Sequence, residues 1–187
     1  MNNYRLARFK DSIFMCGFMG TGKSKIGYEL SKSLDFPFMD LDQFIEEKER
    51  STISEIFKEK GEDYFREKEW EYLLQLTREF KGVIALGGGA LHNQRVVDHL
   101  KLHGLLVFID TPMDIILKRV MRNKKRPILL DESGKLKSEE TLFRELKALY
   151  SSRKALYEQA QIKFENDESL DIKDKVQKVI KKIKRHV

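Results

Sequence analysis

Short apolar runs and segments with helical periodicity alternate along the chain. Because the apolar runs contain few interspersed polar residues, they are typical of strands that are covered on both faces of a sheet. Strands that alternate with helices predict an α/β fold with a mostly parallel sheet. The expected strands cover residues 13–16, 37–39, 83–86, 105–109 and 162–164.

The helices between these strands carry start signals. Thr52 with Glu55 three residues later is a capping box. Thr111 before Pro112 predicts a capping hydroxyl followed by a proline in the first helical position. A long helix is expected over residues 62–80, where large apolar side chains recur near helical spacing.

Two segments interrupt the alternation. Residues 41–80 form an unusually long, mostly helical insertion between the second and third strands. Residues 122–137 are basic at first and then contain a polar turn around Gly134. We interpret the second segment as a lid that closes over a substrate and excludes water.

The size and composition favour one domain that spans residues 1–187. The single cysteine, Cys16, excludes an internal disulfide and fits a reducing compartment. We find no apolar stretch long enough to cross a membrane, so a cytoplasmic location is expected. The lysine-rich residues 173–187 predict a final helix that packs one aliphatic face on the core. Binding of that helix to a membrane surface or to nucleic acid is the less favoured interpretation.

A phosphate-binding motif follows the first expected strand. Residues 17–24 read Gly-Phe-Met-Gly-Thr-Gly-Lys-Ser and match the pattern G-x-x-x-x-G-K-[ST] in full. Glycines let successive amide groups turn toward phosphate oxygens, and the following helix adds partial positive charge. Lys23 can reach the β- and γ-phosphates, and the Ser24 hydroxyl can join a Mg²⁺ shell. The motif alone does not separate kinases from other nucleotide-binding proteins.

Acids and glycines follow two other strands. Asp40 and Asp42 come after the second strand, and residues i and i+2 of an extended chain point the same way. Both carboxylates are therefore expected at the carboxyl edge of the sheet, where open α/β sheets bind ligands. We assign Asp40 to Mg²⁺ through water and Asp42 to the acceptor hydroxyl. The triple glycine 87–89 would let the backbone approach a ligand closely.

Three arginines fall in separate segments, at Arg66, Arg126 and Arg153. A planar guanidinium grips a carboxylate or a phosphate with two parallel hydrogen bonds. Each arginine taken singly also fits a surface ion pair. Arg126 lies in the expected lid, where it could stabilise the charge of a phosphate in transfer.

Taken together and in their order along the chain, these motifs resemble those of the shikimate kinase family over nearly the whole sequence. The matching stretches are residues 17–24, Asp-Leu-Asp at 40–42, Gly-Glu-Asp-Tyr-Phe-Arg-Glu at 61–67, Leu-Gly-Gly-Gly-Ala at 86–90, Arg-Pro at 126–127 and Ser-Arg-Lys-Ala-Leu-Tyr at 152–157. The resemblance implies a three-layer αβα P-loop kinase core with a five-stranded sheet, a helical substrate-binding insertion and a lid. It implies ATP and Mg²⁺, and phosphorylation of the 3-hydroxyl of shikimate by a monomer that binds neither nucleic acid nor membrane.

The resemblance also implies roles for individual residues. On the nucleotide side it places Gly20, Thr21, Gly22, Lys23, Ser24, Lys25, Arg119 and Arg126, with Arg119 near the adenine. On the acceptor side it places Asp42, Arg66, Gly87, Gly88, Gly89 and Arg153, with the two arginines on the shikimate carboxylate. Ser24, and Asp40 through water, hold the metal. Asp42, Lys23 and Arg126 are the expected catalytic residues.

Two rival functions stay open on the sequence alone. A kinase for gluconate or a nucleoside monophosphate would explain the phosphate-binding motif equally well. It would not require Asp42, Arg66, the triple glycine and Arg153 together. A non-enzymatic ATP-binding or nucleic-acid-binding protein would use aromatic side chains among exposed cations, and the C-terminal segment offers only aliphatic ones.

Overall fold

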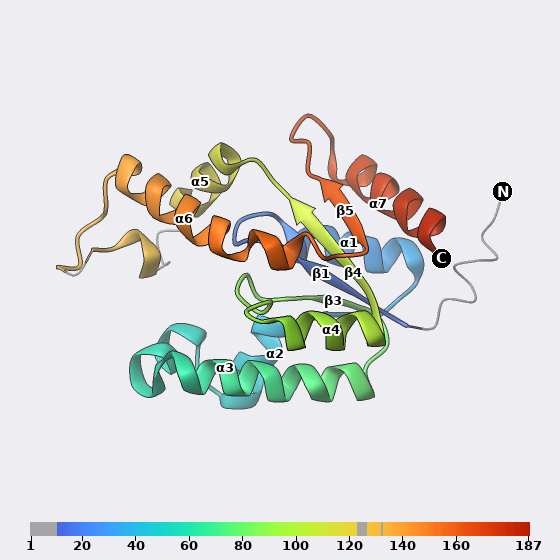
Figure 1. The fold of residues 1–187 in the computed structure, drawn as a ribbon, viewed down its shortest axis with the longest axis horizontal. Coiled ribbons are helices and arrows are strands. Elements are labelled where there is room, and N and C mark those ends of the chain that lie inside the picture. The colour runs from blue at the N-terminus through green and yellow to red at the C-terminus, as the bar shows by residue number, and fades with distance from the viewer. Residues whose placement is uncertain (1–10, 123–126, 132) are drawn as a thin grey trace.

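A computed structural model describes residues 11–122, 127–131 and 133–187 (Figure 1). These residues form five strands and seven α-helices. In chain order they are β1 (Ser12–Cys16), α1 (Lys23–Leu34), β2 (Phe38–Asp40), α2 (Leu41–Glu49), α3 (Ile53–Glu79), β3 (Val83–Ala85), α4 (Gln94–His103), β4 (Gly104–Asp110), α5 (Met113–Arg122), α6 (Glu139–Tyr157), β5 (Ile162–Glu165) and α7 (Ile172–His186). A 3₁₀ helix, Pro127–Leu129, precedes α6.

The five strands form one sheet in the order β2-β3-β1-β4-β5, and every neighbouring pair is parallel. The expected α/β fold is confirmed, and each expected strand lies within one or two residues of its observed bounds. Ile13 of the central strand pairs with Val83 on one side and Leu105 on the other. Because all strands run the same way, their carboxyl ends meet at a single edge of the sheet, where ligands bind in such folds.

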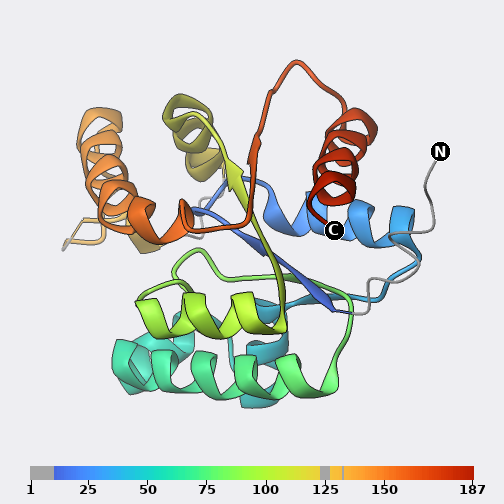
Figure 2. The ribbon, with the colours of Figure 1, turned by 45° about the vertical axis from the view of Figure 1, so that its right-hand side comes forward.

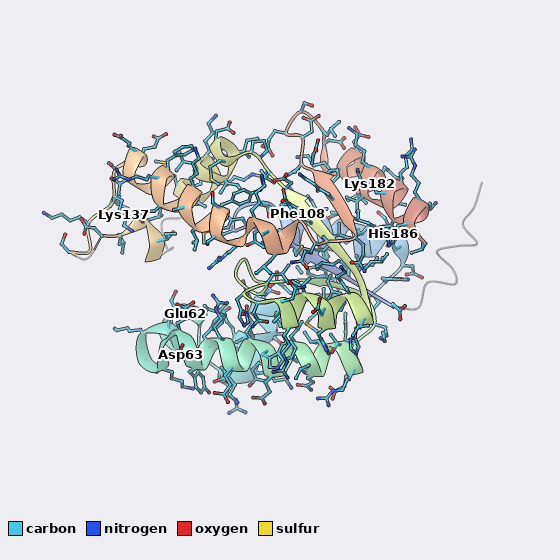
Figure 3. The ribbon with its side chains drawn as sticks, viewed as in Figure 1. Glu62, Asp63, Phe108, Lys137, Lys182 and His186 are labelled. Carbon is cyan, nitrogen blue, oxygen red and sulfur yellow. The ribbon has the colours of Figure 1, made fainter. Side chains whose placement is uncertain are left out.

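Helices cover both faces of the sheet, as Figure 2 shows. Along the strands, successive side chains enter different cores, because strand side chains alternate between faces. One core joins the sheet to α1 and α7, and it includes Ile13, Met15 and Val107. The other joins the sheet to the remaining helices and includes Phe14 and Phe108. Phe108 stacks on Tyr157 of α6 at 5.3 Å between ring centroids, and Figure 3 shows it next to the C-terminal end of that helix.

The final helix is amphipathic, as expected. Val176, Val179, Ile180 and Ile183 are buried against β5 and α1, and most of the lysines of α7 are exposed. Its N-terminus is capped by Asp171, whose side chain accepts from the amide of Asp174. The confirmed packing accounts for the apolar periodicity of α7 without a further partner.

The long insertion consists of α2 and α3. The capping box predicted from Thr52 and Glu55 is present at the start of α3. The helix expected over residues 62–80 begins earlier, at Ile53, and it is interrupted at Gly61. Gly61 has φ 83°, a left-handed conformation that glycine adopts without steric cost, so the chain changes direction there.

A buried carboxylate ties the two helices of the insertion together. Glu49, at the end of α2, accepts hydrogen bonds from the hydroxyls of Tyr64 and Tyr72, both at 2.7 Å. Lys60 approaches the same carboxylate at 3.2 Å. The tyrosine hydrogen bonds lower the pKa of Glu49 to about 2, and they hold α2 against α3.

The described residues just before α6 form a turn that is closed by a β-bridge. Leu130 and Leu136 form an antiparallel bridge around a turn, and the carboxylate of Asp131 accepts from the amides of Ser133 and Lys135. Arg126, the expected lid arginine, lies outside the described residues. In the described part of the chain, no helix is long and apolar enough to cross a membrane.

Candidate functional site

A cleft of about 850 Å³ opens at the carboxyl ends of the strands. It is lined by α2, α3, the glycine turn after β3, the phosphate-binding loop and single residues of α5 and α6. Most of the residues predicted from the sequence lie on its walls, namely Gly20, Gly22, Lys23, Ser24, Lys25, Asp42, Arg66, Gly87, Gly88, Gly89, Arg119 and Arg153. The sequence motifs therefore converge on one cavity.

The loop between β1 and α1 has the backbone of a phosphate cradle. Gly17, Gly20 and Gly22 have φ values of 134°, 77° and 93°, which a residue with a side chain rarely adopts. Lys23 is buried, and its ammonium donates to the carbonyl of Phe18 at 2.9 Å. That contact keeps the charge of Lys23 beneath the loop, close to the amides that would receive phosphate oxygens.

Ser24 and Asp40 meet at the end of β2. The Ser24 hydroxyl donates to one carboxylate oxygen of Asp40 at 2.5 Å. The other oxygen of Asp40 caps α2 by accepting from the amides of Asp42 and Gln43. Asp40 is therefore both a helix cap and part of an oxygen-rich corner next to the phosphate loop.

Asp42 lies in an environment that disfavours its charge. Burial first, and then the nearby carboxylates of Asp40 and Glu69, raise the pKa of Asp42 to about 6. Lys23 acts in the opposite direction, and its effect is smaller. A carboxyl group with a pKa this near neutrality can exchange a proton at physiological pH, as a general base must.

The triple glycine is needed for close approach, not for an unusual φ. A Cβ at Gly87 would lie 2.6 Å from Oδ1 of Asp42, and a Cβ at Gly89 would lie 2.6 Å from Nη2 of Arg66. A Cβ at Gly88 would lie 3.0 Å from the amide nitrogen of Met19. The turn thus packs its backbone directly against both expected substrate residues and the phosphate loop.

Arg66 is held between two acids of its own helix. Its Nη1 donates to Glu69 at 2.6 Å, and its Nε and Nη2 approach Glu62 at 3.3 and 3.2 Å. Glu62 is exposed at the cleft rim, and Figure 3 shows it on the side of α3 that faces α6. A guanidinium has five N–H donors, so these contacts leave donors for a substrate carboxylate.

Glu69 is a site residue that the sequence reasoning missed. Its side chain is only 2% exposed, it lines the cleft, and burial raises its pKa. In the described part of the chain, its Oε1 has no hydrogen-bond partner. The spacing of three residues from Arg66 was the available signal, because residues i and i+3 of a helix are neighbours.

Arg153 reaches the same glycine turn from α6. Its Nη1 donates to the carbonyl of Gly88 at 3.1 Å, and the hydroxyl of Tyr157 donates to that oxygen at 2.6 Å. Arg119 of α5 donates to the carbonyl of Gly20 at 2.7 Å and forms an ion pair with Glu168. The two arginines therefore lie at opposite parts of the cleft, one at the turn and one at the phosphate loop.

Two residues predicted from the sequence, Thr21 and Thr111, do not line the cleft. The Thr21 side chain is buried and donates to the carbonyl of Phe18 at 2.8 Å, and the Thr21 amide donates to the same oxygen at 3.4 Å. The cap predicted at Thr111 is wrong, because in the described residues its hydroxyl accepts from Asn166 and donates to the carbonyl of Thr21, and no amide of α5 donates to it. The apolar lining was also missed in the sequence, and it comprises Met19, Ile53, Phe57, Phe65, Leu86 and Ile128.

The family model described as shikimate kinase matches residues 19–184. The chain belongs to the shikimate kinase family. A shikimate kinase of Staphylococcus haemolyticus is 40% identical over 159 residues, which cover 84% of this chain and 87% of the relative. Membership of the family confirms the resemblance inferred from the ordered motifs.

Solved structures agree with this assignment. The crystal structure of a shikimate kinase from Bacteroides thetaiotaomicron has a TM-score of 0.83 at 33% identity, and the match covers 91% of this chain and 97% of that one. A shikimate kinase from Acinetobacter baumannii in complex with shikimate has a TM-score of 0.80 at 34% identity, with 93% of each chain covered. The P-loop kinase fold expected for the family is therefore confirmed.

Proposed function

We propose that the protein transfers the γ-phosphate of ATP to the 3-hydroxyl of shikimate, giving shikimate 3-phosphate and ADP. One observation carries the proposal beyond family membership. Asp42, Arg66 and Arg153, which come from three different helices, line the same cleft as Lys23 of the phosphate loop. An acidic alcohol and a nucleotide tail can thus be bound next to each other, as phosphoryl transfer requires.

The phosphate loop forms the nucleotide half of the cleft. Amides of the phosphate loop, other than that of Thr21, which donates to the carbonyl of Phe18, and the ammonium of Lys23 would bind the phosphates. Both groups direct positive charge toward an anion. Arg119, already bonded to the Gly20 carbonyl, would lie along the nucleoside. Arg126 is proposed to reach the transferred phosphate from the lid at residues 122–137, and it lies outside the described residues.

The Ser24–Asp40 corner fits a magnesium ion. Mg²⁺ prefers oxygen ligands, keeps several waters and is often bound by few protein groups together with substrate phosphates. Within residues 11–122, 127–131 and 133–187, no cluster of three or more His, Cys, Asp or Glu side chains could hold a metal ion. We assign Ser24 as a direct ligand and Asp40 as a ligand through water, because their oxygens meet next to the phosphate loop. When bound, Mg²⁺ neutralises charge that develops on the phosphates.

The other half of the cleft suits shikimate. Arg66 and Arg153 would bind its carboxylate, and the backbone of Gly88 and Gly89, which lines the cleft beside them, would lie against its ring. Asp42 would accept a hydrogen bond from the 3-hydroxyl and take its proton, or orient it, as the oxygen attacks the γ-phosphorus. The P–O bond to ADP breaks as the new P–O bond forms.

The experiment is a coupled assay of ADP release with shikimate, gluconate and nucleoside monophosphates as acceptors. Only shikimate should support turnover, and Mg²⁺ should be required. Turnover with gluconate or a nucleoside monophosphate but not with shikimate would refute the proposal. ATP binding without turnover on any acceptor would favour a binding module instead.

We also propose that the protein is a cytoplasmic monomer with one domain over residues 1–187, a substrate-binding insertion at 41–80 and no nucleic-acid or membrane partner. Its size and its single cysteine fit this arrangement. Sedimentation analysis at micromolar concentration, with and without substrates, tests the oligomeric state. A dimer that persists at submicromolar concentration would contradict it.

A further inference from the structure

One buried amide joins three segments beneath the phosphate loop. Asn166 follows β5 directly and is 3% exposed. Its backbone amide donates to the carbonyl of Asp110, the last residue of β4, at 2.7 Å. Its side-chain Nδ2 donates to the carbonyl of Thr21 at 3.0 Å and to the hydroxyl of Thr111 at 3.1 Å. The loop, β4 and β5 are thereby connected through one side chain.

The hydrogen bonds fix which end of the amide faces the loop. A backbone carbonyl can only accept, so the nitrogen of Asn166 must face the Thr21 oxygen. The Thr111 hydroxyl accepts from the same nitrogen and donates to the Thr21 oxygen at 3.4 Å. Two donors from outside the loop therefore converge on one carbonyl of the loop.

The position of this carbonyl determines where the next amide points. In a planar trans peptide, the C=O of Thr21 and the N–H of Gly22 point in opposite directions. When Thr21 directs its oxygen into the protein, Gly22 must direct its N–H outward, and Gly22 lines the cleft. Glycine adopts either sign of φ readily, so the peptide before Gly22 could turn over at small cost if nothing held it.

Stability alone does not explain the amide at this position. In the described part of the chain, Oδ1 of Asn166 is buried without a hydrogen-bond partner. An unpaired buried acceptor costs about 1–3 kcal/mol. The donor end of the side chain compensates for that cost only through its contacts with Thr21 and Thr111.

We propose that Asn166, assisted by Thr111, is a positioning residue that orients the Gly22 amide toward the phosphates of the nucleotide. The proposal rests on the proposed kinase function, because it concerns the same phosphate loop. It does not involve the acceptor half of the cleft. Loss of the Asn166 donor should therefore weaken phosphate binding and leave shikimate binding unchanged.

The test compares the wild type with Asn166→Asp, which keeps the shape but replaces the donor with an acceptor, and with Asn166→Ala and Thr111→Val. Titration calorimetry measures the affinity for ADP and for tripolyphosphate, a probe that offers phosphates without a nucleoside. Both Asn166 variants should lose at least about tenfold in affinity for each probe, a difference of roughly 1.4 kcal/mol. Thr111→Val should lose less, since Asn166 still holds the carbonyl.

The control is Val179→Ala, which weakens the packing of α7 on the sheet without touching the loop. It should lower the melting temperature and leave both affinities within twofold. The KM for ATP should rise in the Asn166 variants while the KM for shikimate stays within twofold. Unchanged tripolyphosphate affinity in the folded Asn166 variants would overturn the proposal. Wild-type turnover with shikimate is scored separately, so failure of the kinase function is distinguishable.

Discussion

Replacing Asp42 with asparagine should abolish turnover and at the same time stabilise the fold at neutral pH. The carboxylate lies in the cleft, where burial and the charges of Asp40 and Glu69 raise its pKa from 3.8 to about 6. The folded protein therefore binds this proton more tightly than the unfolded chain does. The favourable contribution of protonated Asp42 to the free energy of unfolding is fully present below pH about 4 and is lost as the pH rises through 6.

The expected magnitude follows from the shift in the pKa. One pKa unit corresponds to about 1.4 kcal/mol, so ionised Asp42 destabilises the folded state by about 2 to 3 kcal/mol above pH 7. A negative charge in the first turn of α2 offsets roughly 0.3–1 kcal/mol of this through the helix dipole. Burial and repulsion are the larger effects. Asp42→Asn should therefore raise the free energy of unfolding by about 2 kcal/mol at pH 8.

Urea denaturation of both proteins at pH values from 4 to 8 measures the difference. The gain in the variant should be largest at pH 8 and close to zero at pH 4. Asp63→Asn is the matched control, because Asp63 lies two residues after the non-helical Gly61, as Asp42 lies two residues after the helix cap Asp40, but Asp63 is exposed. It should show no such trend. A variant at Asp42 that is no more stable than the wild type at pH 8 would refute the electrostatic reasoning.

Three further predictions concern other parts of the site. Gly89→Ala places a methyl group against Nη2 of Arg66, so the KM for shikimate should rise at least about tenfold while the KM for ATP changes less than twofold. Steady-state kinetics measure both constants, and equal changes in the two would contradict this prediction. Tyr72→Phe removes a 2.7 Å hydrogen bond to the Glu49 carboxylate and should lower the free energy of unfolding by about 1.5–3 kcal/mol. Urea denaturation measures this difference, and a variant as stable as the wild type would contradict the prediction. The kcat/KM for shikimate should fall tenfold per pH unit below about pH 6, because Asp42 must be ionised to accept a proton; a profile that stays flat to pH 5 would exclude this role.

Much of the fold and half of the cleft could be predicted from local patterns. The motif at residues 17–24 specifies its own geometry, because glycine spacing, lysine and helix start are all short-range features. Asp40 and Asp42 could be placed because parallel strands end at one edge of the sheet. The extended backbone expected between them is wrong, because Asp42 lies in the first turn of α2. These inferences needed no knowledge of contacts between distant segments.

The rest depends on contacts that no local pattern encodes. The break at Gly61 could not be predicted, because the residues around it form helix on both sides and a glycine can also occur inside a continuous helix. The burial of Glu69 follows from the close approach of the Gly87 backbone. Asn166 contacts Thr21 across 145 residues of sequence, and its position depends on the pairing of β5 with β4.

The single cysteine offers a practical means of following the protein in solution. Cys16 ends the central strand and is 1% exposed, and burial raises the pKa of its thiol, so the reactive thiolate scarcely forms in the folded state. An alkylating reagent can modify Cys16 only when the middle of the sheet opens. The rate of labelling would thus report how often the core opens, and a nucleotide bound just above this strand should slow it in proportion to its occupancy.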